Sequence, residues 1–222
     1  MRGVALQISA LMLSCLLLAG CWNDSWSWNQ KLTVKVETPD GPVQGAAVNQ
    51  VTWGEVNSVH NYPASYQGEA VVVDLGNGRY LFALIGEPTK FLAFETFNGG
   101  PGIGEEVFAE MAQFRGTNPV PPEHYPLLVT FTDINDPKTV KKVDPNNLAA
   151  TFGSGFALES IMLEITDEPV TKGGVEEVLG ENFFRVWAKL NNEALSRAGI
   201  SDPYFKTFMS TLNRTEFIRR QK

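Results

Sequence analysis

Cysteine and histidine are both scarce in this chain of 222 residues, which has only two of each. Cys15 and Cys21 lie in the first 21 residues, whereas His60 and His124 lie in segments rich in proline and tyrosine. Because Cys21 is the last cysteine, the rest of the chain can form neither an internal disulfide nor a thiolate zinc site. We therefore expect the folded part to depend on its apolar core.

Basic charge is also in short supply. The chain has 18 lysines and arginines against 25 aspartates and glutamates, a formal net charge of −7. This balance argues against nucleic acid as a partner, since nucleic-acid binding requires a basic surface. It also argues against broad electrostatic adhesion to anionic lipid. Hydrophobic residues make up 43% of the chain, which indicates a folded protein rather than a disordered one.

The N-terminal segment 1–20 has the layout of a secretory signal peptide. Arg2 precedes an apolar stretch from Val4 to Ala19, which is too short for a convincing membrane-spanning helix. The stretch ends in Leu18-Ala19-Gly20-Cys21, which resembles the lipobox of bacterial lipoproteins. The resemblance implies that diacylglycerol is attached to the Cys21 thiol and that cleavage makes Cys21 the new N-terminus.

The lipobox predicts a location and a partner. Through an acylated Cys21, the chain would be held by membrane lipid on the exported side of a cell membrane, since two or three acyl chains anchor stably. In proteobacterial lipoproteins an aspartate after the cysteine favours the inner membrane, and this chain has Trp22 there. The outer membrane is therefore favoured if the source is Gram-negative. An ordinary signal peptide with a chance cysteine remains the alternative.

Residues 21–30 are predicted to form a tether rich in tryptophan. Trp22, Trp26 and Trp28 lie within eight residues of Cys21. Because indole rings favour the membrane–water interface, we expect these three side chains to form an aromatic collar on the bilayer. The alternative is that the rings pack on the folded domain.

Residues 31–170 are predicted to form a β domain. From 32 to 38, apolar Leu32, Val34 and Val36 alternate with polar residues, which is typical of a strand. Gly76-Asn77-Gly78 supplies residues suited to positive φ between two apolar runs and predicts a tight hairpin. Segments 127–133 and 157–166 are expected to add further strands.

Two motifs in this domain carry a second resemblance. The sequence VETPDGPVQGAAV followed by LGNGRYLFALI is similar to transthyretin-like, carboxypeptidase-regulatory-like modules of exported bacterial proteins, over about residues 31–96. The resemblance implies a mainly β fold, a transthyretin-like or immunoglobulin-like β-sandwich. It carries no catalytic residues, because such modules mostly bind, space or support.

A short helix is predicted inside the β domain, near residues 105–114. Its apolar residues are spaced for one helix face. They are Val107, Phe108, Met111 and Phe114. The preceding glycine-rich stretch does not form a phosphate-binding loop, because no lysine follows it and the helix would begin with Glu105 and Glu106.

Residues 171–222 are predicted to form a helical hairpin. Apolar residues recur at helical spacing from Phe183 to Ala198, Gly199 suits a helix C-cap, and Asp202 suits the N-cap of a second helix. The apolar faces would pack on each other or on the sandwich, or would bind an envelope protein partner. The basic end of the chain would complement the helix C-terminus, or contact lipid headgroups or an acidic partner. Its cations are Arg214, Arg219, Arg220 and Lys222.

The strongest polar constellation is a calcium candidate. Carboxylate and amide oxygens clustered after a strand are ligands that calcium accepts. The candidates are Asp133, Asn135, Asp136 and Asp144. The first three resemble the calcium-ligating linker of cadherins, although Pro137 follows where that motif has asparagine. The alternative is that these residues simply form turns, in which aspartate, asparagine and proline are common.

Together these features predict a membrane-anchored lipoprotein of the cell envelope that acts as a non-catalytic binding or structural module and needs no cofactor. One alternative is an envelope hydrolase or metal-dependent enzyme that uses His60, His124 and loop carboxylates. Another is an adhesion module stabilised by calcium.

Overall fold

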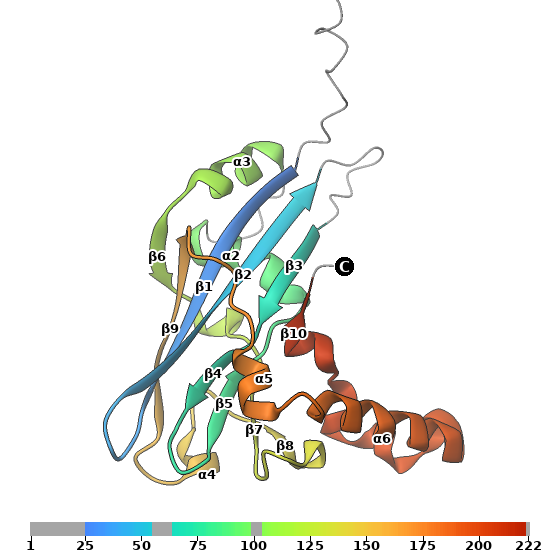
Figure 1. Cartoon of the computed structure of the whole chain (residues 1–222). Coiled ribbons are helices and arrows are strands. Elements are labelled where there is room, and N and C mark those ends of the chain that lie inside the picture. The colour runs from blue at the N-terminus through green and yellow to red at the C-terminus, as the bar shows by residue number, and fades with distance from the viewer. Residues whose placement is uncertain (1–24, 55–63, 99–103, 221–222) are drawn as a thin grey trace, which may run out of the picture.

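The computed structural model describes residues 25–54, 64–98 and 104–220. These residues form a mixed α/β structure with two antiparallel sheets, of six and four strands, arranged like a sandwich (Figure 1). The predicted signal peptide, Cys21, Trp22 and His60 lie outside the described residues. Within the described ranges, none of the helices combines the length and the apolar character that crossing a bilayer would require.

The larger sheet is built around one long central strand. Its strand order is β10-β3-β2-β1-β9-β6. The bounds are β1 Ser25–Glu37, β2 Val43–Gly54, β3 Ala64–Glu69, β6 Gly116–Pro119, β9 Ala157–Thr166 and β10 Ile218–Arg219. β1 pairs along its length with β2 on one side, from Ser25↔Gly54 to Val36↔Val43, and with β9 on the other. The strands predicted at 32–38 and 157–166 are confirmed, and the first begins earlier than expected.

The smaller sheet contains the predicted glycine-rich hairpin. Its order is β4-β5-β7-β8, with bounds β4 Val71–Asp74, β5 Tyr80–Ala83, β7 Leu128–Phe131 and β8 Val140–Lys142. β4 and β5 pair antiparallel, and the turn between them has positive φ at Gly76, Asn77 and Gly78. Because such turns match the twist of the strands they join, this hairpin forms as the sequence predicts.

The sheets enclose a first apolar core, which we call the sandwich cluster. On β1 the inward side chains are Leu32, Val34 and Val36, as the alternation predicts. Gly45 of β2 lies so close to β4 that a Cβ atom there would stand 2.0 Å from the carbonyl oxygen of Val72. Only glycine allows this approach of the two sheets.

The other face of the smaller sheet is buried as well, against the C-terminal part of the chain. Leu81 and Ala83 of β5 face the sandwich cluster, whereas Phe82 faces a second core, the C-terminal cluster. Burial on both faces explains why the β5 sequence is apolar without alternation. The buried members of the C-terminal cluster include Phe82, Phe131, Val175, Phe183, Trp187, Met209, Phe217 and Ile218.

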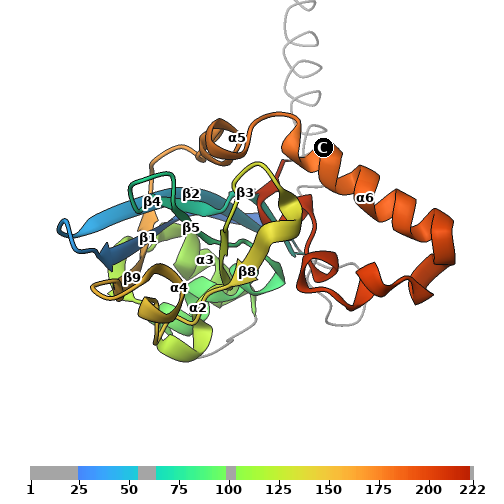
Figure 2. The ribbon, with the colours of Figure 1, turned by 90° about the horizontal axis from the view of Figure 1, so that it is seen from below.

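The C-terminal segment is not the predicted helical hairpin. α5 (Gly174–Leu179) and α6 (Phe183–Ala198) are helices, and Gly199 caps α6 with a φ of 58°. Figure 2 shows α6 extending outward along the edge of the fold. The chain then forms four short 3₁₀ helices and β10 instead of a second α-helix. They are η5 Gly199–Ser201, η6 Pro203–Lys206, η7 Phe208–Thr211 and η8 Arg214–Glu216.

Two features break the expected second helix. Thr207 and Leu212 have extended backbones, with ψ of 153° and 156°. The hydroxyls of Ser210 and Thr211 donate to main-chain carbonyls three residues earlier, and this local bonding competes with helix formation. Asp202 does cap a helix by accepting from the Tyr204 amide, but that helix is only the short η6.

Short helices close the rest of the sandwich. α2 (Leu92–Phe97) and α3 (Glu105–Gln113) lie beside the larger sheet, and α4 (Ala149–Phe152) lies at its far end (Figure 1). The remaining 3₁₀ helices are η2 Glu87–Lys90, η3 Pro122–His124 and η4 Pro137–Thr139. α3 confirms the helix predicted near 105–114, and its Phe108 and Met111 are buried as the spacing predicts.

The structure corrects the tryptophan-rich tether. β1 already begins at Ser25, so residues 25–30 belong to the sheet. Trp28 is 3% exposed and packs edge-on against Phe94, with ring centroids 5.5 Å apart. Trp26 is half-buried against Phe108. The collar prediction is therefore wrong for Trp28, and Trp26 packs on the domain, because both rings complete the apolar end of the sandwich cluster.

Candidate functional site

The calcium candidates lie in turns and act there as caps. Asp133, Asp136 and Asp144 each accept a hydrogen bond from the backbone amide two residues further on, at 2.9 to 3.0 Å. Those amides belong to Asn135, Lys138 and Asn146. Within 25–54, 64–98 and 104–220, no group of three or more histidine, cysteine, aspartate or glutamate side chains could hold a metal ion. The geometry thus agrees with the turn interpretation.

His124 pairs with a carboxylate that the sequence did not single out. Its Nε2 atom lies 3.2 Å from Oε2 of Glu95, which projects from α2. His124 ends η3, which begins with Pro122, and the following Tyr125 is held extended before Pro126. His60 lies outside the described residues, so the predicted meeting of the two histidines is not tested.

The His124–Glu95 pair lies in a concave surface, which we call the His124 groove. It consists of two adjoining cavities of about 330 Å³ and about 610 Å³. The residues that line both are Glu87, Pro88, Leu92, His124 and Tyr125. Apolar walls with a few polar groups are typical of small-molecule sites.

One hydrogen bond from β1 and one from the residues that follow β5 fix the walls of the groove. Gln30 of β1 is 2% exposed, and its amide donates to the carbonyl oxygen of Thr89 in η2 at 3.0 Å. The Ile85 amide donates to the carbonyl of Glu216 at 2.8 Å, which ties the C-terminal segment to the same wall. Because each wall is held by a buried or main-chain bond, the groove is formed without a ligand.

Carboxylates give the groove an acidic character. Glu87, Glu95, Glu123 and Glu216 all line it. A hydrogen bond from Lys90 holds the pKa of Glu87 below its usual value, so this carboxylate stays charged. Burial raises the pKa of Glu216. An apolar groove with carboxylates in its lining suits an apolar molecule that carries a cationic group.

A second concave surface, the arginine hollow, lies over β2 and β3, beside the C-terminal residues that pair with β3. Its volume is about 580 Å³. Polar side chains of the two strands form its floor, and three arginines of the C-terminal segment form its side. These side chains include Gln50, Thr52, Gln67, Arg214, Arg219 and Arg220. The described residues that line the hollow include no aspartate or glutamate.

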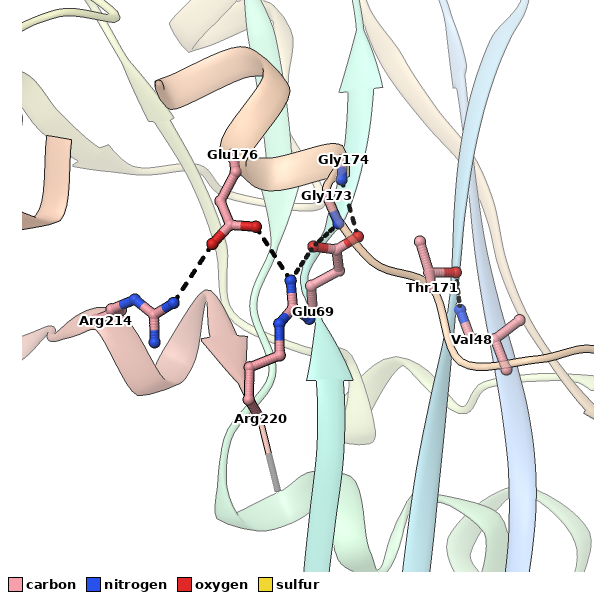
Figure 3. Close-up of polar contacts among 8 residues, drawn as sticks. All are labelled: Val48, Glu69, Thr171, Gly173, Gly174, Glu176, Arg214 and Arg220. Carbon is pink, nitrogen blue, oxygen red and sulfur yellow. Dashed lines mark hydrogen bonds and ion pairs between the residues drawn. The ribbon is translucent and has the colours of Figure 1, made fainter. Parts of the chain in front are cut away.

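A polar network holds the C-terminal segment against β3 (Figure 3). Glu69 is 1% exposed and accepts from the amides of Gly173 and Gly174, at 3.1 and 3.0 Å. Nη2 of Arg220 lies 3.4 Å from Glu69 and 3.2 Å from Glu176. A carboxylate buried this deeply is stable only when it is hydrogen-bonded and paired, as here.

Gln30 was not identified from the sequence, although the sequence contains a signal for it. Gln30 stands between Trp28 and Leu32 at an inward position of the alternating strand, where a polar residue indicates a buried hydrogen bond. Glu95 gave no such signal, because its partner His124 is distant in the sequence. Glu69 gave none either.

In comparisons with protein-family models, curated proteins and solved structures, nothing matched this chain.

Proposed function

We propose that this chain is a lipid-anchored lipoprotein of the cell envelope whose folded part is a non-catalytic binding module, with the His124 groove as its ligand site. The lipobox at Leu18–Cys21 supports the anchor. The similarity of about residues 31–96 to transthyretin-like modules supports a binding role, because such modules mostly bind, space or support.

The groove itself is the observation that carries the proposal. Its walls come from separate parts of the chain, η2 and α2 on one side and η3 and η7 on the other. Main-chain bonds such as Leu84 N to Leu127 O, at 2.9 Å, join these parts. A site held open in this way loses little conformational entropy when a ligand enters, which favours binding.

The lining indicates the class of ligand. Phe91, Leu92 and Tyr125 offer apolar and aromatic surface, and Glu123 adds an exposed carboxylate. Aromatic faces and carboxylates both attract cations. We therefore propose a small apolar molecule with a cationic group as the ligand.

Three probes with the same octyl chain test this ligand class. Octyltrimethylammonium, octyl glucoside and octyl sulfate carry a cationic, neutral and anionic head, and each is titrated into the protein by calorimetry below its micelle concentration. We expect affinity to fall in that order. Equal affinity for all three, or a preference for the sulfate, would contradict the proposed charge selectivity.

Variants of the groove locate the binding. Glu95→Gln together with Glu123→Gln should weaken octyltrimethylammonium binding about thirtyfold and leave octyl glucoside binding unchanged, since each of the two carboxylates contributes on the order of 1 kcal/mol to a nearby cation. The matched control is Glu105→Gln with Glu106→Gln, which removes the same charge from exposed positions on α3. An equal loss in the control would assign the effect to net charge.

The anchor has its own test, which is independent of the groove. The full chain, expressed in a bacterium with labelled palmitate, should incorporate the label and sediment with membranes. Cys21→Ala should remove the label and leave the precursor uncleaved. A labelled Cys21→Ala protein, or an unlabelled wild type, would overturn the lipoprotein assignment.

The contact between His124 and Glu95 favours a second candidate function, an envelope hydrolase. A histidine beside a carboxylate is a typical general base, because the carboxylate orients and stabilises the imidazolium. The substitution His124→Gln separates the two functions. Under the binding proposal it changes octyl glucoside affinity little, whereas a hydrolase would lose turnover of a bound ester probe.

A further inference from the structure

The arginine hollow lies near the membrane if Cys21 is lipidated. Ser27 of β1 pairs with Thr52, and Thr52 pairs with Ser65, so these residues form one row across three strands. Ser27 is the sixth residue after Cys21, which places this row within about 20 Å of the anchored residue. The next row, at Asn29, lies within about 26 Å by the same measure. The hollow opens over both rows.

The floor of the hollow is a ladder of amide and hydroxyl groups. Nε2 of Gln50 donates to Oδ1 of Asn29 at 3.2 Å, and Nε2 of Gln67 donates to Oε1 of Gln50 at 2.7 Å. The hydroxyls of Ser27 and Thr52 lie 2.8 Å apart. Each amide keeps further donor or acceptor capacity, so the floor can bind the hydroxyl groups of a ligand.

The side of the hollow supplies positive charge with donors to spare. A guanidinium has five N–H donors, and the ion pairs use Nη2 of Arg214, Nη1 of Arg219 and Nη2 of Arg220. These pairs are long, at 3.2 to 3.4 Å, and their carboxylates lie outside the lining of the hollow. They orient the guanidinium groups without closing the site.

Arg219 is also held by an aromatic ring. Its guanidinium carbon lies 4.3 Å from the centroid of the Tyr66 ring, and Tyr66 is buried. Stacking on an aromatic face holds the planar guanidinium in one orientation, which reduces the entropy lost on binding an anion. A planar fork of donors is well suited to the oxygens of a phosphate group.

We propose that the arginine hollow binds the headgroup of an anionic phospholipid of the anchoring membrane, with the phosphate on Arg214 and Arg219 and the headgroup hydroxyls on Gln50 and Gln67. This inference rests on the proposed lipid anchor. It is compatible with the net charge of −7, because the site is local and the described residues of its lining include three arginines and no carboxylate.

The experiment uses the lipidated full chain in two sets of lipid nanodiscs. One set contains phosphatidylcholine alone, and the other contains phosphatidylcholine with phosphatidylglycerol. Hydrogen exchange is followed by mass spectrometry in peptides covering 64–69 and 214–219. We expect exchange in these peptides to slow only in the discs with phosphatidylglycerol, and the protection to weaken at high salt. No difference between the discs would overturn the proposal.

Two pairs of variants separate the hollow from general electrostatics. Arg214→Gln with Arg219→Gln should abolish the protection. Arg115→Gln with Arg185→Gln removes the same charge elsewhere, from exposed positions that do not line the hollow. Arg115 is a stringent control, because it lies at the same level along the sheet as Gln30 but at the opposite edge. It precedes Gly116, which pairs with Ile165, and Ile165 pairs with Gln30. Equal loss in both pairs would overturn a specific site.

Titrations with two soluble ligands distinguish a lipid headgroup from free phosphate. Glycerol phosphate and inorganic phosphate are titrated into the chain in phosphatidylcholine discs. Glycerol phosphate is expected to bind, and about tenfold more weakly in the Arg214→Gln, Arg219→Gln pair, which corresponds to about 1.4 kcal/mol. Binding of inorganic phosphate at equal strength, without protection by phosphatidylglycerol discs, would overturn the membrane source.

A separate measurement shows whether Cys21 carries the lipid. A chain without lipid on Cys21 lacks the added mass in intact mass spectrometry and is not retained in the discs. That result contradicts the proposed lipoprotein, whereas a retained chain without headgroup-dependent protection contradicts only the hollow.

Discussion

The two faces of the smaller sheet are covered in different ways. The sandwich cluster lies against a second sheet whose strands satisfy one another's backbone groups. The C-terminal cluster lies against α5, α6 and a series of 3₁₀ helices whose ends depend on side-chain caps. Strands β4, β5 and β7 contribute side chains to both clusters. The two clusters therefore differ only in the segments that cover them.

This difference teaches that equal burial does not mean equal cooperativity. Phe94 and Phe217 are both fully buried, one in each cluster. Phe94 packs against Trp28 and Trp53 of the long paired strands β1 and β2, whereas Phe217 follows η8 in a segment of short turns. Segments with few regular hydrogen bonds open locally at a lower free energy. We therefore expect the C-terminal segment to exchange its amides before the sandwich unfolds.

The largest expected effect is in the sandwich cluster. Phe94→Ala should lower the free energy of unfolding by about 4 kcal/mol, because the long paired strands β1 and β2 beside Phe94 cannot collapse into the cavity. Urea denaturation followed by tryptophan fluorescence measures the change. If Phe94→Ala lowered the free energy of unfolding less than Phe217→Ala does, the expected difference between the two clusters would be wrong.

In the C-terminal cluster, Phe217→Ala should cost about 3 kcal/mol, at the lower end for phenylalanine, since short turns can settle into the space. Hydrogen exchange should accelerate in residues 199–217 and remain unchanged in β1 and β9. If exchange rose equally in those strands, the two clusters would be one cooperative unit.

A smaller loss of stability is expected from Glu69, which joins β3 to the C-terminal segment. Glu69→Gln replaces one acceptor of the Gly173 and Gly174 amides by a donor and removes the ion pair with Arg220. We expect a loss of about 2 kcal/mol, typical of a buried group left partly unpaired. Glu37→Gln, at an exposed strand end, is the control and should change urea stability little.

The smallest effect concerns pH. A hydrogen bond from the Tyr204 amide, and to a smaller extent one from Arg197, holds the pKa of Asp202 below its ordinary value. A lowered folded-state pKa means that Asp202 stabilises the fold above its unfolded pKa and loses this contribution as the pH falls through the folded value. Asp202→Asn should therefore flatten the acid limb of thermal stability. An unchanged pH profile would mean that the Asp202 carboxylate does not stabilise the C-terminal segment.

The sequence predicted those elements whose burial is one-sided. β1 and β9 alternate because one face of the larger sheet is exposed, and the β4–β5 turn needs residues that accept positive φ. α3 and α6 follow from helical spacing. The second helix predicted after Asp202 was wrong, because an N-cap residue also suits a short 3₁₀ helix such as η6.

The candidate sites were less accessible to sequence reasoning. Residue type singled out His124, but Glu95 became its partner only through the packing of α2 beside η3. Similarly, the basic end of the chain was visible in the sequence, whereas its position over the ladder of Gln50 and Gln67 follows from the pairing of β10 with β3. Contacts between distant segments depend on topology, which local patterns do not specify.

The placement of β1 has a mechanical consequence. This strand is the first of the fold and is bonded on both sides, to β2 and to β9. Inter-strand hydrogen bonds are perpendicular to the strands, so a pull on Ser25 along β1 loads both ladders in shear, with many bonds sharing the force. A tether that pulls from this end acts where the sheet resists extension best.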